Sequence, residues 1–400
     1  MSKGIVKKLA LLLALVMAFT LMAAGCGSKK TESSPSPSPG GASSAPAASP
    51  SEEAKAPAET YKIGVNTWGS GVPLLDTFGD NGEYTARLMG NETMRASDDF
   101  TAEKETNNVQ NFCAAGVDGI VLAAAGVTNL LQMGDICKSA KVPFVLATFI
   151  GEKPDRDKLI ENNPYYVGCI DLDMVRDGRE VAQMALADGC KTAVIIGGNI
   201  GDNNMDQRSQ GFREAFEAGG GKVLSEARCT DASECPTKAE DMLSAYKDVD
   251  CLYAMVGDYI PGSLSAIDKL GLKGKIKVYM SCIDKTSAEY IKEGIIQAGN
   301  DGIVLPSLIA PTLLQNYLDG HPILDENGKP PHLQVHPFKV DRNNVDDYMK
   351  VFTTEGRKPL PDEMLKNLCY RFNPDVTYED FLDLVNNLTL DDLLKAHGVK

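Results

Sequence analysis

The sequence has little of what metal, nucleotide and catalytic sites are built from. It has four histidines, all in its last quarter. Two of them, His332 and His336, are four residues apart, but their segment reads as extended and not as the helix on which such a pair holds a metal. No G-x-G-x-x-G follows the first predicted strand and no G-x-x-x-x-G-K-[ST] is present, so nucleotide phosphates lack their usual cradle. A G-x-S-x-G nucleophile motif is also missing. We therefore expect no metal, no cofactor and no catalytic residue.

Basic residues and long apolar runs are also scarce. The net charge is −15, and removal of the three lysines of the first 26 residues makes it −18. A chain of this charge is a poor partner for nucleic acid and for anionic lipid. After residue 26, no apolar run reaches the roughly 20 residues that a membrane-spanning helix needs.

The first 26 residues indicate an export signal. Three lysines and a 16-residue uncharged run, Leu9 to Ala24, precede Cys26, which is the pattern of a signal peptide. The ending Ala23-Ala24-Gly25-Cys26 resembles a bacterial lipobox, in which the cysteine becomes the lipid-carrying N-terminus, although most lipoboxes have Leu where Ala23 stands. Ordinary secretory cleavage, which would release the protein, is the alternative.

Residues 27–60 form a low-complexity tract of Ser, Pro, Ala and Gly. Such a composition has too few apolar side chains to bury a core. As a flexible coil the tract has a root-mean-square span of roughly 30 Å. We expect it to tether a folded domain to a membrane surface.

Ten cysteines are many for an exported chain. If Cys26 carries lipid, nine remain, and an odd number cannot pair completely within one chain. Most of these cysteines sit within apolar patterns that are typical of buried thiols. Cys229 and Cys235 flank a short polar loop, where a disulfide and two free thiols are both open.

From residue 61 onward, strand-like apolar runs alternate with helical patterns. This alternation predicts parallel sheets with both faces covered by helices. About 340 residues are too many for one ordinary core and suit two lobes. The predicted strands lie near Tyr61–Val65, Thr93–Ser97, Gly119–Ala123, Pro143–Ala147, Tyr165–Ile170, Ala193–Ile196, Val223–Ser225, Cys251–Met255, Lys277–Ser281 and Ile295–Ala298.

Residues 192–216 carry the most specific signal. Thr192 to Ile196 is a β-branched run of the kind found in buried strands, and a polar loop and a helix containing Arg208 follow it. Open α/β sheets bind ligands at the carboxyl ends of their strands. An arginine there offers a fork of donors suited to sugar hydroxyls or a carboxylate. A salt bridge to a neighbouring side chain is the alternative role of Arg208.

A strand, a small polar loop and R-x-x-G-F opening a helix resemble the ribose and galactose type of the type 1 periplasmic binding proteins, the solute receptors of ABC importers. The resemblance implies an α/β fold of two doubly wound, Rossmann-like lobes joined by a three-strand hinge, with ligand trapped as the lobes close. It places 61–170 plus 301–335 in the N-terminal lobe and 171–300 plus 336–400 in the C-terminal lobe. It also implies a monomer that delivers its ligand to ABC permease subunits.

The resemblance selects side chains in the loops after the first-lobe strands. Asn66 and Trp68 follow the first strand, where an indole can stack on the C–H face of a sugar and the amide can contact a hydroxyl. Asp98 and Asp99 follow the second strand; we expect one to cap the next helix and the other to reach the cleft. Phe149 ends a later strand and offers either a second stacking face or a core side chain.

In the second lobe the resemblance points to three further loops. Asp258 and Tyr259 follow the strand near Cys251–Met255 and are expected to bind ligand. Relatives usually have Asp where Cys282 falls, and Asp284 is expected to substitute for it. Asn300 and Asp301 stand near the Gln or Asn that the family places at the second crossing between lobes, and Asn300 is the selected ligand-binding residue.

Residues 352–400 extend beyond the family landmarks. Thr377 and Thr389 each precede a leucine-rich pattern, so we expect them to cap two short amphipathic helices. We expect these helices to pack on the C-terminal lobe, and a docking patch for a partner is the alternative.

Together these features predict a membrane-tethered, extracytoplasmic lipoprotein that captures a small polar ligand, in the first place a sugar, for an ABC importer. A co-receptor of a sensor kinase or chemoreceptor would use the same site with a different partner. An exported carbohydrate-acting enzyme would also need a general acid and a general base in one cleft.

Overall fold

The computed structural model describes residues 59–123, 129–148 and 153–400. The predicted export signal, nearly all of the predicted tether, Cys26 and Phe149 lie outside the described residues. Within the described ranges, every helix is too short or too polar to cross a bilayer.

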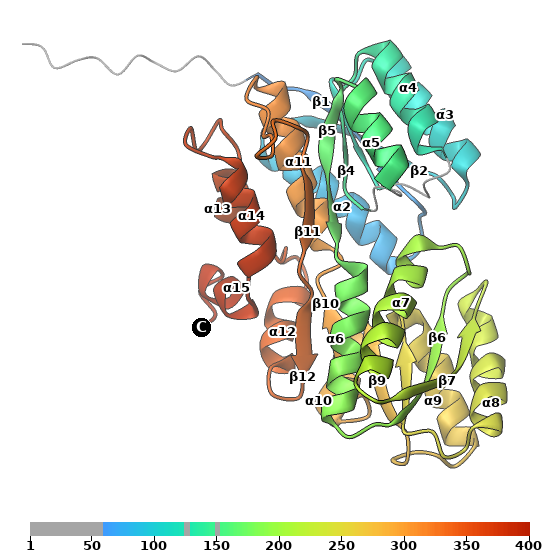
Figure 1. The fold of residues 1–400 in the computed structure, drawn as a ribbon. Helices are drawn as coiled ribbons and strands as arrows, with labels where there is room; N and C mark the ends of the chain where they lie inside the picture. The colour runs from blue at the N-terminus through green and yellow to red at the C-terminus, as the bar shows by residue number, and fades with distance from the viewer. Residues whose placement is uncertain (1–58, 124–128, 149–152) are drawn as a thin grey trace, which may run out of the picture. The chain divides into compact units, whose positions relative to one another are not determined.

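The first sheet contains six strands that all pair in parallel, in the order β11-β5-β4-β3-β1-β2. Its buried strands are apolar on both faces because helices cover both. Helices α2 and α11 pack on one face, and α3, α4 and α5 on the other (Figure 1). The elements are β1 (Lys62–Thr67), α2 (Pro73–Leu88), β2 (Glu92–Ser97), α3 (Ala102–Ala114), β3 (Gly119–Leu122), α4 (Leu130–Ala140), β4 (Phe144–Leu146), α5 (Lys153–Asn162), β5 (Tyr166–Leu172), α11 (Leu305–Leu318) and β11 (His332–Val335).

The second sheet has the order β12-β10-β9-β8-β6-β7, with only β12 antiparallel to its neighbour. Helices α6 and α7 cover one face, and α8, α9, α10 and α12 cover the other. The predicted fold class of two doubly wound α/β lobes is confirmed. The elements are α6 (Met174–Ala187), β6 (Thr192–Gly197), α7 (Asn203–Ala218), β7 (Lys222–Arg228), α8 (Cys235–Ala245), β8 (Cys251–Ala254), α9 (Ile260–Lys269), β9 (Lys277–Ser281), α10 (Lys285–Glu293), β10 (Ala298–Asp301), β12 (Phe338–Asp341) and α12 (Val345–Phe352).

Three short connections join the two sheets. The first is Asp173, between β5 and α6, and the second is 302–304, between β10 and α11. The third is 336–337, between β11 and β12. Since β5 and β11 are neighbours in one sheet and β10 and β12 in the other, the three connections lie side by side and form a hinge.

The C-terminal helices correct one expectation. Helices α13 (Asp362–Asn367) and α14 (Tyr378–Asn387) contact α11, α2 and β11 of the first lobe. Helix α15 (Leu390–Ala396) contacts α12 of the second lobe. The assignment of 336–400 to the C-terminal lobe is therefore wrong for α13 and α14, although Thr377 and Thr389 do stand at the predicted helix N-caps.

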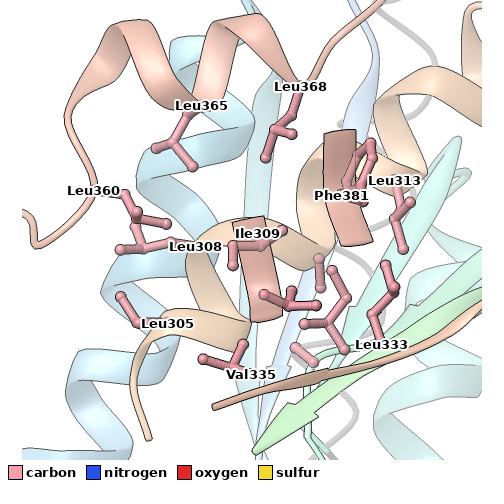
Figure 2. Close-up of a cluster of buried hydrophobic side chains, with 14 of the residues drawn as sticks. Leu305, Leu308, Ile309, Leu313, Leu333, Val335, Leu360, Leu365, Leu368 and Phe381 are labelled. Carbon is pink, nitrogen blue, oxygen red and sulfur yellow. The ribbon is translucent and has the colours of Figure 1, made fainter. Parts of the chain in front are cut away.

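The physical reason is the apolar surface of α11. This helix is buried on nearly every side, and a helix that is hydrophobic all round needs cover beyond one sheet. Figure 2 shows side chains of the C-terminal segment directed at α11 and β11. The labelled members of this buried cluster are Leu360, Leu365, Leu368 and Phe381 from the C-terminal segment, and Leu305, Leu308, Ile309, Leu313, Leu333 and Val335 from α11 and β11.

All nine cysteines in the described ranges are free thiols. Cys235 Sγ donates to the backbone carbonyl of Tyr259 at 3.2 Å rather than joining Cys229. Burial raises the pKa of Cys235 to about 11, so the thiol is protonated at neutral pH. At this loop the structure has two free thiols and no bridge.

Truncation of Phe381 tests the packing of the C-terminal segment on the first lobe. Phe381→Ala should lower the free energy of unfolding by about 3 to 5 kcal/mol, because it leaves a cavity in a fully buried cluster. Urea denaturation of the purified chain measures this. Leu324→Ala, at a position 41% exposed, is the matched control and should cost less than about 0.5 kcal/mol; similar losses for both variants would contradict the packing.

Candidate ligand-binding site

A cleft of about 800 Å³ opens between the lobes beside the hinge. Loops after β1, β2, β6, β7, β8, β9 and β10 all contribute to its walls. These loops lie at the carboxyl ends of parallel strands, where open α/β sheets place their ligands. Its volume is within the usual range for small-molecule sites, about 300 to 1,000 Å³.

The first-lobe wall is aromatic. Trp68 and Phe78 line it, together with Phe100, whose side chain is 54% exposed. Asp99 and Phe100 have φ of +46° and +64°, a left-handed conformation that costs energy in residues other than glycine. The Phe100 ring lies on the backbone of Gly69, where an added Cβ would be 2.4 Å from the ring. The strained turn therefore presents Phe100 beside Trp68.

Phe100 is a cleft residue that the sequence interpretation missed. It follows the two aspartates that were selected, but only its aromatic character and its position after β2 could have signalled it. The nearby polar side chains face elsewhere. In the described structure the cleft surface includes none of Asn66, Asp98 and Asp99.

Asn66 and Asp98 form a buried support beneath this wall. Asp98 accepts hydrogen bonds from Asn66 Nδ2 at 2.8 Å and Asn108 Nδ2 at 3.0 Å, and burial raises the pKa of Asp98 to about 6. Asp99 is exposed and pairs with Lys104. The expected aspartate cap is also wrong, because Thr101 caps α3 by accepting from the Lys104 backbone N–H.

Arg208 combines both roles that the sequence left open. It lines the cleft at only 2% exposure, its Nε donates to Asp177 Oδ2 at 2.6 Å, and an NH2 nitrogen lies 3.0 Å from Cys282 Sγ. Glycines bring the two helices together: a Cβ on Gly178 would lie 2.0 Å from a backbone oxygen of α7, and one on Gly211 equally close to α6. The ion pair balances the guanidinium charge and fixes its remaining N–H groups at the cleft wall.

Three predicted side chains of the second lobe do line the cleft: Asp258, Tyr259 and Asp284. Partial burial and the charge of Asp284 raise the pKa of Asp258. Asp284 caps α10, accepting the Ser287 N–H at 2.7 Å. Cys282 lies in the cleft beside Arg208, and burial raises the pKa of its thiol to about 12, so a protonated thiol stands at this contact.

At the hinge, Asp301 lines the cleft and the predicted residue Asn300 does not. The Asn300 amide donates to the backbone carbonyl of Asp177 at 3.2 Å and is not part of the cleft surface. Asp301 lines the cleft at 4% exposure and accepts a hydrogen bond from the Tyr348 hydroxyl. Asp171 lines it at 5% exposure. In the described part of the chain, one oxygen of each carboxylate, Oδ1, has no hydrogen-bond partner.

These two orphaned oxygens are chemically informative. A buried carboxylate oxygen can only accept, and leaving it unsatisfied costs free energy. Both carboxylates belong to residues that line the cleft, while the two orphaned oxygens themselves are buried. The sequence located Asp171 and Asp301 only as crossing points, since nothing in a linear pattern shows which way a side chain turns.

Among the described residues, one group of metal-ligand types lies close together: Cys169, Asp171 and His332, with ligand atoms within 4.8 Å of one another. His332 Nδ1 lies 3.1 Å from an Arg156 guanidinium nitrogen and its Nε2 2.9 Å from Asp171 Oδ2. A guanidinium can only donate, so Nδ1 accepts and Nε2 carries the proton to Asp171. A metal ion bound to Nε2 would require the ring proton to sit on Nδ1, where it would face an arginine N–H donor. The contacts therefore favour a chain of hydrogen bonds over a metal site.

Residues 73–306 match the family model described as periplasmic binding protein domain. No curated protein matches the chain in sequence. Solved structures match over most of their length, at identities that show the fold alone.

Three of these structures illustrate the likeness. The sugar ABC transport substrate-binding protein of Bordetella parapertussis is 20% identical, with a TM-score of 0.62 over 72% of this chain and 91% of that one. A solute-binding protein of Actinobacillus succinogenes with bound D-allose is 18% identical, with a TM-score of 0.64 over 72% and 100%. The arabinose-transporter component of Shewanella sp. ANA-3, bound to L-arabinofuranose, is 18% identical, with a TM-score of 0.62 over 72% and 94%.

The titration of Asp301 gives a prediction with a definite sign. Burial raises its pKa to about 6, against about 3.9 in an unfolded chain. Between pH 4 and pH 6 the folded state therefore binds more protons at Asp301 than the unfolded state does. The stability that this proton contributes is fully present below about pH 4 and is lost as the pH rises through about 6. Relative to the wild type, Asp301→Asn should gain about 2 to 3 kcal/mol between pH 4 and pH 7. Urea unfolding at both pH values measures this, and a constant difference would contradict it.

Proposed function

The chain belongs to the periplasmic binding protein family, and from that premise we propose that it captures a sugar between its two lobes and delivers it to an ABC importer. The observation that carries this proposal is the pairing of an aromatic wall with a polar one across a single cleft. Trp68 and Phe100 form the first, and Arg208, Asp258 and Asp301 belong to the second.

This pairing matches the chemistry of a sugar ring. The ring has apolar C–H faces, which favour flat aromatic surfaces, and an edge of hydroxyls that both donate and accept. The orphaned oxygens of Asp171 and Asp301 accept from hydroxyls, and the free N–H groups of Arg208 donate to them. Micromolar binding corresponds to about 8 kcal/mol, which a few charge-assisted hydrogen bonds and two stacking contacts supply.

The solved structures support the same ligand class. Solved structures of this fold hold bound D-allose, L-arabinofuranose and myo-inositol, all small polyhydroxylated rings. The hinge of three short connections suits capture by lobe closure, which is how two-lobed receptors trap ligands. Because capture requires only binding, the site needs no general acid or base.

We further propose that the protein acts as a monomer outside the cytoplasm, held to the membrane through Cys26. The basic and apolar start of the sequence, its small residues before Cys26 and the polar tract of 27–60 support this. A tether of roughly 30 Å would let the folded part reach a permease in the same membrane.

Removal of the aromatic wall tests the ligand class. In thermal shift and calorimetric titration against allose, arabinose, ribose, galactose and myo-inositol, one ligand should raise the melting temperature. Trp68→Ala and Phe100→Ala should each weaken its affinity about tenfold, the equivalent of one lost stacking contact. Phe372→Ala, an exposed phenylalanine outside the cleft, should leave affinity unchanged. A panel that stays flat after sugar acids are added to it would reject the proposal.

The anchor is tested on Cys26. The full-length protein expressed in a bacterium should be recovered with the membranes and should incorporate labelled palmitate. Cys26→Ser should abolish the label and move the protein away from the membrane fraction, because the thioether-linked lipid has no other attachment point in the lipobox pattern. Cys113→Ser is the matched control and should remain membrane-bound. Equal labelling of both variants would exclude Cys26 as the anchor.

A further inference from the structure

Residues 353–361 form an additional wall of the cleft. They run from Thr353, which follows α12 of the second lobe, to the first lobe, where Leu360 is fully buried in its core. Thr353, Arg357, Lys358 and Pro359 all line the cleft. The family match ends at residue 306, so this wall lies beyond the part of the chain that the family model describes.

The wall is held in place by a turn within it and by contacts at and beyond its C-terminal end. The Arg357 backbone N–H donates to the Thr354 carbonyl at 3.1 Å, and the Pro359 carbonyl is 3.0 Å from His397 Nε2 of the C-terminal segment. Beyond it, Asp362 accepts from the Tyr84 hydroxyl of α2. A segment fixed in this way can position a side chain for a ligand.

Lys358 is the side chain that this wall presents. It is half-buried, its Nζ donates to Asn81 Oδ1 at 2.9 Å, and the same atom lies 5.4 Å from the centre of the Tyr84 ring. Among the ion pairs of the described residues, none involves Lys358 or Arg357. Burial lowers the pKa of Lys358, with the charge of Asp80 opposing the shift. A partly buried ammonium with only neutral contacts favours an anion.

Six aspartates line the cleft, and among the ion pairs of the described residues none joins one of them to Lys358. Asp202, Asp231 and Asp284 are committed to backbone N–H groups at helix starts, and Asp171 and Asp301 need donors for their orphaned oxygens. Asn81 connects Lys358 with the hinge, because its Nδ2 lies 3.3 Å from the carbonyl of Val304, three residues after Asp301. The cleft therefore offers acceptors for hydroxyls near the hinge and an unpaired cation beside them.

We propose that the segment 353–361 adapts this cleft to an acidic sugar, a uronic or aldonic acid, whose carboxylate pairs with Lys358 while its hydroxyls donate to Asp171 and Asp301. A lysine ammonium is a compact charge that pairs with a carboxylate without requiring one fixed orientation. This inference rests on the proposed sugar-binding function and narrows it.

Matched sugars test the inference by calorimetric titration at pH 7.5. The pairs are glucose with glucuronate and galactose with galacturonate, and gluconate represents the aldonic acids. The wild-type protein should bind one acid at least about tenfold more tightly than its neutral parent, the effect of one hydrogen-bonded charge pair. In Lys358→Met this ratio should fall to about 1, while Lys358→Arg should retain most of it.

Lys329→Met is the matched control, since Lys329 is an exposed lysine outside the cleft, and it should keep the wild-type ratio. A second readout needs no variant: raising the salt concentration should weaken binding of the acid and leave binding of its neutral parent unchanged, because salt screens only the charge pair. This readout decides the question if Lys358→Met does not fold.

Each outcome has a defined meaning. Neutral sugars that bind as tightly as their acids, or an acid preference that survives in Lys358→Met, would overturn the inference and leave the proposed function standing. An acid preference without salt dependence would also overturn it. Failure of every neutral and acidic sugar to bind would overturn the proposed function itself.

Discussion

The buried ion pair between Arg208 and Asp177 is the interaction on which the second-lobe site depends. Asp177 accepts from Arg208 of α7 and from Ser281 of β9, and its backbone carbonyl accepts from Asn300 of β10. Two buried charges cost several kcal/mol to desolvate and repay this only with good geometry and further hydrogen bonds. The close approach of α6 and α7 at Gly178 and Gly211 provides that geometry. One pair thus fixes two helices, two strands and the orientation of the arginine in the cleft.

Beside the hinge, side chains of both lobes belong to one apolar cluster. The cluster extends from α11 and β11 through the C-terminal helices to Val351 of α12 and Phe338 of β12. Since interiors are close-packed, residues 353–400 are an integral part of the first-lobe core. They also cross between the lobes beside the three hinge connections. The same packing that completes the core positions the segment carrying Lys358 at the cleft.

Sequence reasoning located the loops of the site more reliably than the direction of their side chains. It selected Trp68, Arg208, Asp258, Tyr259 and Asp284, and the structure places these at the cleft. It also selected Asn66, Asp98 and Asn300, which turn inward to partners on other elements. Phe100, Asp171 and Asp301 each lie within two residues of a selected residue or named crossing, yet only the fold shows that they face the cleft. Successive side chains of a strand point to opposite faces of the sheet, so a difference of one residue changes which face a side chain occupies.

The sequence by itself determined the export signal pattern, the alternation of strands and helices, and the motif that puts Arg208 after β6, because periodicity, turn residues and capping are local properties. Only the tertiary structure decided which distant segments pack against one another. The left-handed turn at Asp99 and Phe100, the orphaned oxygens at the hinge and the docking of α13 and α14 on α11 all arise from contacts between residues far apart in the chain. Short-range patterns carry no information on which buried surface a distant segment will cover, so these features became visible only once the chain had folded.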